Sequence, residues 1–216
     1  MDIKLFETPV PILNIDILEE NIQDMARLAD NNNVTLKPMV KTHKSPEIAL
    51  KQMEYGAGGV TVATLDEAEA MIGAGIKNIF IAYEIIGPSR INRLLKLAKK
   101  ADISVAIDSI DGAVMLDKQL EEKNMVLDYL IEIDSGLNRC GVDPGQPALE
   151  LSEKIEKRCN YLKLQGIFTH AGQVYGVSDS AKVETIGHHE GQVMAKTAKL
   201  FRQNNRELDI VSVGST

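Results

Sequence analysis

The chain has 216 residues, 44% of them hydrophobic and 25% charged, so it can bury a sizeable core as a globular protein. Its formal net charge of −7 gives no long-range attraction to phosphate backbones or anionic lipids, which argues against nucleic acid and membrane surfaces as partners. No apolar run approaches the roughly 20 residues of a membrane span, and the N-terminal sequence does not read as a secretory leader. We therefore expect a cytoplasmic protein whose two cysteines, Cys140 and Cys159, are free thiols.

The first predicted element is an amphipathic helix that starts near Asp16, with Glu19 three residues further on as a capping partner. Its apolar residues recur at spacings of three and four and form one stripe: Ile15, Leu18, Ile22, Met25 and Leu28. This helix precedes the first of a series of strand-like runs.

Seven strand-like runs rich in β-branched residues follow, and each of the first six leads into a segment with a helical apolar pattern. Such an alternation predicts βα units and a parallel sheet. One helix start is marked by Thr64 with Glu67 three residues on, the pattern of a capping box. The predicted strands are residues 34–41, 58–64, 78–84, 103–109, 127–135, 162–170 and 208–215.

Two architectures can hold about seven βα units: a (β/α)₈ barrel and a doubly wound open sheet. An open sheet predicts a glycine-rich phosphate loop after its first strand, but that position reads KTHKSP, residues 41–46. The barrel is therefore favoured, and polar residues at the carboxyl ends of its strands are expected to face the active-site mouth. Counting alternate positions brings polar groups from several strands to this rim: Lys41, Asp108, Asp134, His170 and Ser215.

The stretch LKPMVKTHKSP, residues 36–46, places three lysines around the end of the first predicted strand. Alternation turns Lys41 inward at the mouth, where a partly desolvated amine beside the cations His43 and Lys44 can attack carbonyl groups. We interpret Lys44 as a solvated loop cation. Lys37 shares the inward face but lies deeper, so it should need a carboxylate partner such as Glu132 or Asp108. Asp108 and Asp134 are expected to support the rim rather than act as bases.

Six segments in order along the chain resemble the D-threonine aldolase and D-serine dehydratase family, whose members are pyridoxal-phosphate (PLP) enzymes of the alanine racemase fold type. These segments are TPVPILNIDILEENI, KPMVKTHKSPEIA, VATLDEAEAMIGAGI, IDSGLNRCGV, GIFTHAGQVYG and VSVGST. The resemblance implies a PLP-binding TIM-type barrel of fold type III. It also implies that this chain is an N-terminal portion, with the barrel incomplete and a C-terminal β-domain absent. Residues 1–13 would then be a strand of that β-domain, and residues 14–216 the partial barrel.

The resemblance also assigns roles to individual residues. Lys41 matches the lysine that forms the internal aldimine with PLP, and Arg139 matches an arginine near the phenolic oxygen of the cofactor. His170 matches a histidine that packs against the pyridine ring, and Tyr175 a tyrosine near the cofactor. The implied phosphate cup is Gly214, Ser215 and Thr216, which suits an anion because small residues leave backbone N–H groups accessible. Lys41, Arg139 and His170 are thus the predicted catalytic residues.

The chain also departs from the family pattern. Lys37 and Met39 stand where members often have arginine and histidine, and Gln173 stands where some have histidine. PLP binding is still expected, whereas the particular reaction is left open. The family's divalent metal, zinc, manganese or magnesium, would be held by ligands outside this chain, so no metal ligand is predicted here. The chain alone is expected to show weak activity or none.

The resulting functional prediction is a PLP-dependent lyase that acts on small D-β-hydroxy amino acids. The reaction would be retro-aldol cleavage, as in a D-threonine aldolase, or β-elimination, as in a D-serine dehydratase. Two alternatives stay open: an amino-acid racemase of the same fold type, and a non-catalytic PLP-binding protein. The resemblance further implies a small D-amino acid as the substrate and a homodimer as the full-length form.

Overall fold

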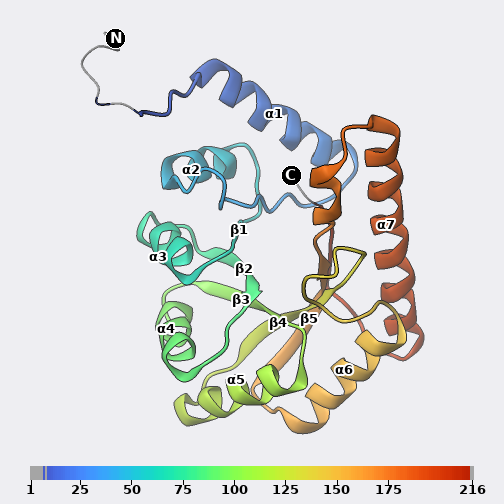
Figure 1. The fold of residues 1–216 in the computed structure, drawn as a ribbon. Coiled ribbons are helices and arrows are strands. Elements are labelled where there is room, and N and C mark those ends of the chain that lie inside the picture. Colours follow the sequence, from blue (N-terminus) through green and yellow to red (C-terminus); the bar gives the residue numbers. More distant parts are fainter. Residues whose placement is uncertain (1–6, 8, 215–216) are drawn as a thin grey trace.

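The computed structural model describes residue 7 and residues 9–214, in which helices alternate with parallel strands (Figure 1). The helices are α1 (Ile15–Asn31), α2 (Pro46–Glu54), α3 (Leu65–Gly73), α4 (Pro88–Ala98), α5 (Ile110–Lys123), α6 (Gln146–Arg158) and α7 (Ser180–Gln203), with a short 3₁₀ helix, η2 (Gly172–Gly176). The strands are β1 (Val60–Val62), β2 (Asn78–Glu84), β3 (Asp102–Ile107), β4 (Leu127–Ile133), β5 (Leu162–Thr169) and β6 (Ile210–Ser212).

The six strands form one parallel sheet in which spatial order follows chain order from β1 to β6. The sheet is curled into a half-barrel, and Figure 1 shows helices α2 to α7 arranged around its outer side. Consecutive parallel strands with one helix in each crossover confirm the predicted βα units. The described residues form six strands, so the eight strands of a complete barrel remain a prediction.

The predicted strand at residues 34–41 is wrong as a regular strand. Within it the structure has a single parallel bridge, between Met39 and Thr61, because Pro38 has no N–H to donate to a ladder. The segment nevertheless runs beside β1: the Thr61 N–H donates to the Pro38 carbonyl at 2.8 Å, and the Val40 N–H donates to the Thr61 carbonyl at 2.9 Å. The segment therefore places the turn that follows it, which contains Lys41, at the edge of the sheet where the strands have their carboxyl ends.

The two faces of the sheet pack differently. The outer face carries a large apolar core against the helices, with Ile81, Val105 and Ile131 among its members. The inner face carries a small cluster of alternate residues: Phe80, Ala106, Leu130 and Phe168. The rings of Phe80 and Phe168 meet edge to face with centroids 4.8 Å apart. Strand alternation is thus confirmed on β2 to β5, and it leaves the inner face free to line a site.

Helix α1 begins one residue before the predicted start. Asn14 is its N-cap, and the side-chain oxygen of Asn14 accepts the Ile17 N–H at 3.2 Å. Within the predicted apolar stripe Ile22 is buried, whereas Ile15, Met25 and Leu28 are 50%, 41% and 56% exposed. The predicted N-terminal strand, residues 1–13, lies largely outside the described residues and stays a prediction. Among the described helices, none has the length and apolar character to cross a bilayer.

The start of α3 confirms Thr64 as the predicted N-cap, while the Glu67 side chain reaches back to the residue before the cap rather than to the cap itself. Thr64 Oγ1 accepts the Glu67 N–H at 3.1 Å, and Glu67 Oε2 accepts the Ala63 N–H at 2.8 Å. The other carboxylate oxygen of Glu67, a side chain only 5% exposed, accepts Lys44 Nζ at 2.9 Å. Lys44 is exposed, as predicted for a loop cation, with 66% of its side chain accessible, but it also ties the turn that follows Lys41 to the end of β1.

We expect Glu67→Ala to lower the free energy of unfolding by about 2–4 kcal/mol, because it removes a cap and leaves Lys44 and the Ala63 N–H without their acceptor. Lys44→Ala should cost about 1 kcal/mol, since its ammonium is largely solvated. Urea unfolding measures both. Glu150→Ala, which removes an exposed partner of Lys154, is the control and should change stability by less than about 0.5 kcal/mol. Similar small losses for Glu67→Ala and the control would contradict this role.

Candidate functional site

A cavity of about 630 Å³ opens on the inner face of the sheet at the carboxyl ends of the strands. Its walls come from the 36–41 segment, from the ends of β2, β4, β5 and β6, and from the loop after β4. The predicted site residues that line it are Lys41, Arg139, His170, Tyr175 and Gly214. Residues separated by up to 173 positions in the sequence are thus brought together, and the volume lies within the usual range for small-molecule sites.

Lys41 lies half-buried in the turn after the bridge to β1, with its side chain in the cavity wall. The turn is closed by the Lys44 N–H, which donates to the Val40 carbonyl at 2.8 Å, and Lys44 has a left-handed φ of 53°. The expectation that His43 and Lys44 are the cationic neighbours of Lys41 is wrong, because neither lines the cavity and Lys44 pairs with Glu67. The cations that do share the cavity are Lys37, Arg90 and Arg139.

Lys37 has a different partner from the one predicted. Its Nζ donates to Asn78 Oδ1 at 2.8 Å rather than to Glu132 or Asp108. Burial lowers the pKa of Lys37, an effect that the charge of Asp102 partly opposes. A neutral amide is therefore sufficient as its partner in the deeper part of the half-barrel.

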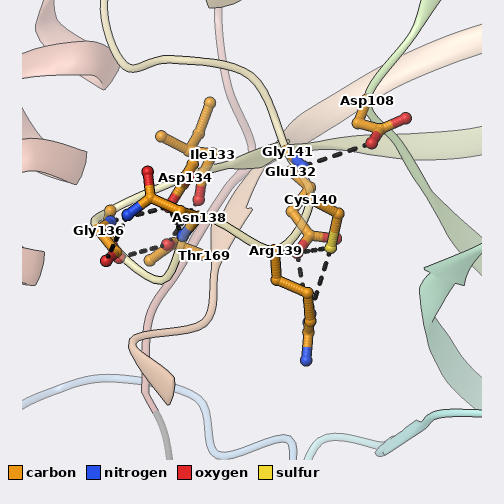
Figure 2. A network of polar contacts seen from close by, with 11 residues as sticks. Asp108, Glu132, Ile133, Asp134, Gly136, Asn138, Arg139, Cys140, Gly141 and Thr169 are labelled. Carbon is orange, nitrogen blue, oxygen red and sulfur yellow. Dashed lines mark hydrogen bonds and ion pairs between the residues drawn. The ribbon is translucent and has the colours of Figure 1, made fainter. Parts of the chain in front are cut away.

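Arg139 sits in a loop after β4 that two aspartates hold in place (Figure 2). Asp134 Oδ1 accepts the N–H groups of Gly136 and Asn138 at 2.8 and 3.1 Å, and Asp108 Oδ2 accepts the Gly141 N–H at 3.3 Å. The predicted supporting role of Asp108 and Asp134 is thereby confirmed. The two carboxylates use backbone donors, so they fix the path of the loop on both sides of Arg139.

The Arg139 guanidinium is anchored to a buried carboxylate. Its Nη2 lies 3.5 Å from Glu132 Oε1, and the Glu132 side chain is only 4% exposed. The Cys140 thiol donates to the same oxygen at 3.0 Å, while Arg139 Nε donates to the thiol sulfur at 3.4 Å; Figure 2 shows these contacts. Burial, followed by the bond to Glu132, raises the pKa of Cys140 to about 11. Cys140 is thus a protonated structural thiol and not an activated nucleophile.

Glu84, at the end of β2, also reaches this cluster, a position that no sequence pattern predicted. One oxygen from each of Glu84 and Glu132 and the Cys140 sulfur all lie within 4.8 Å of one another. Carboxylates and thiols are metal ligands by type, but here a guanidinium already balances Glu132 and the thiol is protonated. We assign no metal to this cluster.

His170 follows β5 and lies beside Tyr175 of η2, with ring centroids 5.7 Å apart and planes inclined by 49°. Burial lowers the pKa of His170, and the positive charges of Arg139 and Lys41 lower it further. The imidazole is therefore neutral at neutral pH, and its flat face can pack against another ring without adding charge. Tyr175 is 59% exposed at the edge of the cavity.

Gly214, just beyond β6, is the described member of the predicted phosphate cup; Ser215 and Thr216 lie outside the described residues. The Gly214 N–H donates to Glu190 Oε1 of α7 at 3.1 Å, and Glu190 is only 5% exposed. Burial raises the pKa of Glu190, and backbone N–H groups of Gly214 and Ala171 oppose this shift. The carboxylate thus holds the end of β6 against α7, a contact that the sequence pattern did not predict.

Comparison with known proteins shows where this arrangement belongs. Residues 13–216 match the family described as alanine racemase, N-terminal domain. The chain belongs to the alanine racemase N-terminal domain family.

Within this family the chain is similar to D-amino-acid lyases. It is 30% identical to a D-threonine aldolase from an Arthrobacter species over 97% of this chain and 55% of that protein. The crystal structure of a D-threonine aldolase from Filomicrobium marinum superposes with a TM-score of 0.90 at 35% identity, over 96% of this chain and 56% of that one. The structure of D-threo-3-hydroxyaspartate dehydratase from a Delftia species superposes with a TM-score of 0.90 at 30% identity, over 98% of this chain and 56% of that one. The chain thus spans about half the length of these relatives.

Enzymes of this family depend on PLP, and the residues present suit that group. An amine, a guanidinium and a neutral imidazole converge on a cavity with an aromatic floor, Phe80 and Phe168. Among residues 7 and 9–214, no atom lies within 4 Å of a Cβ built on Gly214, so the described part of the chain leaves space beside this backbone. An anionic, aromatic aldehyde matches these features in charge, shape and reactivity.

The loop conformation predicts a specific effect of Gly141→Ala. Gly141 has a φ of +94°, and an added Cβ would lie 3.0 Å from the Asp134 backbone nitrogen and 3.1 Å from Glu132 Cγ. The substitution should cost about 2–4 kcal/mol of stability and push Cys140 away from Glu132. Released from this carboxylate, Cys140 would have a pKa nearer its ordinary value and react faster with a disulfide reagent.

Gly145→Ala is the matched control, because Gly145 also has a positive φ, of +78°, but an added Cβ meets nothing within 4 Å. It should cost about 1 kcal/mol and leave the reactivity of Cys140 unchanged. Denaturant unfolding and thiol titration measure both effects. Equal behaviour of the two variants would rule out the close packing of Gly141 as the cause.

Proposed function

We propose that the chain carries the PLP-binding half of a lyase that acts on small D-β-hydroxy amino acids, in a (β/α)₈ barrel. The observation that carries the proposal is the meeting of Lys41, Arg139 and His170 around one cavity. The similarity to D-threonine aldolase and hydroxyaspartate dehydratase at 30–35% identity over 96–98% of this chain supports it, whereas an alanine racemase is 28% identical over 74% of this chain. The lyase reading is therefore preferred to the racemase reading.

Each cavity residue has a defined task in this proposal. Lys41 would hold PLP covalently through Nζ, Arg139 would orient its phenolic oxygen, and the neutral His170 ring would pack on its pyridine ring. Gly214, Ser215 and Thr216 are proposed to surround the phosphate, with Gly214 supplying space rather than its N–H group, which donates to Glu190. Tyr175 would close the exposed edge of the ring.

PLP, when bound, supplies an electron sink that stabilises negative charge at the substrate Cα. The chain supplies position and proton transfer: the Lys41 amine, once released, can carry a proton at Nζ close to that carbon. The Phe80 and Phe168 rings exclude water from the floor of the cavity, and the Glu132 carboxylate holds the Arg139 guanidinium at the cavity wall. A divalent metal that activates the β-hydroxyl is proposed for a longer form of the protein, with ligands outside this chain.

The covalent attachment of PLP is the direct test of Lys41. The chain mixed with PLP should show an absorbance band that borohydride bleaches, and peptide mapping should then find the reduced adduct on Lys41. Lys41→Ala should abolish the adduct, while Lys44→Ala, which changes a lysine three residues away and outside the cavity, should retain it. An adduct on Lys44, or none at all, would overturn the assignment.

Product analysis distinguishes the candidate reactions. With D-threonine and added divalent metal, retro-aldol cleavage gives glycine and acetaldehyde, whereas β-elimination gives 2-oxobutanoate and ammonia; D-serine gives pyruvate and ammonia by elimination. In a form as long as the relatives we expect one of these product pairs, with a larger yield when metal is present, and from this chain alone weak activity or none. Inversion of a D-amino acid without cleavage would favour the racemase alternative. PLP binding with no turnover of any substrate in a form as long as the relatives would favour a non-catalytic carrier.

A further inference from the structure

Glu84 occupies an unusual position at the end of β2. The pairing of β2 with β3 is regular up to Ile81 and Val105, and the next pair is Glu84 with Ala106. Two extra residues are thus accommodated in β2, which draws Glu84 further into the half-barrel than an unbroken ladder would. Bulges of this kind redirect side chains beside functional sites, and Glu84 here lines the cavity.

The surroundings of Glu84 leave one of its oxygens without a donor. Among the described residues no group donates to Glu84 Oε1, although this atom is buried. The nearest polar neighbour is another acid, Glu132, which is almost fully buried and already bound to Arg139 and Cys140. Glu84 is half-buried, Glu132 is almost fully buried, and the one guanidinium in contact with the pair binds Glu132. Two carboxylates this close cannot both keep their charge at low cost, whereas one shared proton satisfies both.

We propose that Glu84 is a positioning residue that keeps its proton at neutral pH, donates it to Glu132, and so fixes the carboxylate on which Arg139 rests. The proposal rests on the proposed function only where Arg139 is taken to contact PLP. Burial, then the contact with Glu132, raises the pKa of Glu84 to about 8, which agrees with this geometry.

The ionisable groups around Glu84 come from several elements. Nearest are Glu132 on β4 and Cys140 in the following loop; Asp108 after β3 adds negative charge. The positive charges that line the cavity are those of Lys37, Lys41, Arg90 and Arg139, and the neutral His170 lines it as well. Of these groups, Glu84 is the acid that changes charge just above neutral pH. The Cys140 thiol follows at higher pH, with its pKa raised to about 11.

The proposal predicts how PLP affinity depends on pH. Below about pH 8 Glu84 is protonated and Glu132 carries the single negative charge of the pair. Above about pH 8 Glu84 also carries a negative charge, which repels the anionic cofactor and competes with it for Arg139. A unit charge about 10 Å away at an effective dielectric of about 20 weakens binding on the order of tenfold. The affinity of the wild-type chain for PLP should fall by this amount between about pH 7 and about pH 9.

Protonation of Glu84 can be tested without PLP. In the chain labelled with ¹³C at the glutamate carboxyls, one NMR signal should stay at the protonated position at neutral pH and titrate near the pKa of about 8 given by the structure. This signal should be missing from Glu84→Gln. If all glutamate signals titrate in the acidic range, the proposal is wrong.

The positioning role is tested by PLP titration of three variants. Glu84→Ala, which has no donor for Glu132, should weaken PLP binding on the order of tenfold at neutral pH, the loss of one charge-assisted hydrogen bond. Glu84→Gln keeps a neutral donor and should recover most of this affinity, without the fall that the wild type shows above about pH 8. Asp128→Asn changes an acid at the opposite end of β4, outside the cavity, and should behave as wild type.

The outcomes separate the two proposals. Equal affinities of Glu84→Ala and Glu84→Gln, with circular dichroism showing both folded, would overturn the positioning role. So would a fall in affinity above neutral pH that Glu84→Gln shares with wild type. The wild-type chain could show the protonated carboxyl signal and yet bind no PLP. In that case the proposed function is wrong, but the proton shared by Glu84 and Glu132 is supported.

Discussion

The contact between Arg139 and the buried carboxylate of Glu132 is the constraint around which the site is built. A carboxylate that is only 4% exposed is costly unless charge and hydrogen bonds compensate it, and Arg139 and the Cys140 thiol do so here. The Arg139 side chain is 51% exposed, so a rigid loop is needed to hold its guanidinium against the buried carboxylate rather than in water. The backbone bonds to Asp134 and Asp108 supply that rigidity.

The parallel sheet makes this arrangement possible because its faces have separate tasks. The outer face carries the large apolar core against the helices, which supplies most of the burial. The inner face needs only a small aromatic and aliphatic cluster below the cavity, so Glu84 and Glu132 can stand on strands that are otherwise apolar. Stability and binding are thus assigned to opposite sides of the same strands.

Sequence patterns were sufficient where a feature depends on local chemistry. Runs such as 78–84 and 127–135 predicted β2 and β4 because apolar β-branched residues alternate there, and the Thr64 and Glu67 pattern predicted the start of α3. Sequence patterns did not predict features that depend on contacts between residues far apart in the chain. Pro38 reduces a predicted strand to one bridge, and Lys44 finds a buried acid on a helix that follows it by more than 20 residues. Glu84 could not be predicted, because its depth depends on an irregularity in strand register.

The charge of the site also runs against that of the whole chain. A net charge of −7 argues against polyanionic partners, and yet the cavity gathers four cationic side chains: Lys37, Lys41, Arg90 and Arg139. Glu84 and Glu132 are the acids among its described lining residues, and under the proposal that they share one proton they offset a single cation. The remaining positive potential is confined to a concave site, where low-dielectric walls focus it on a small anion. The sign of the field at the site is therefore set by the side chains that line the cavity and not by the sum over the surface, which is what the proposed binding of a phosphorylated cofactor by an acidic protein requires.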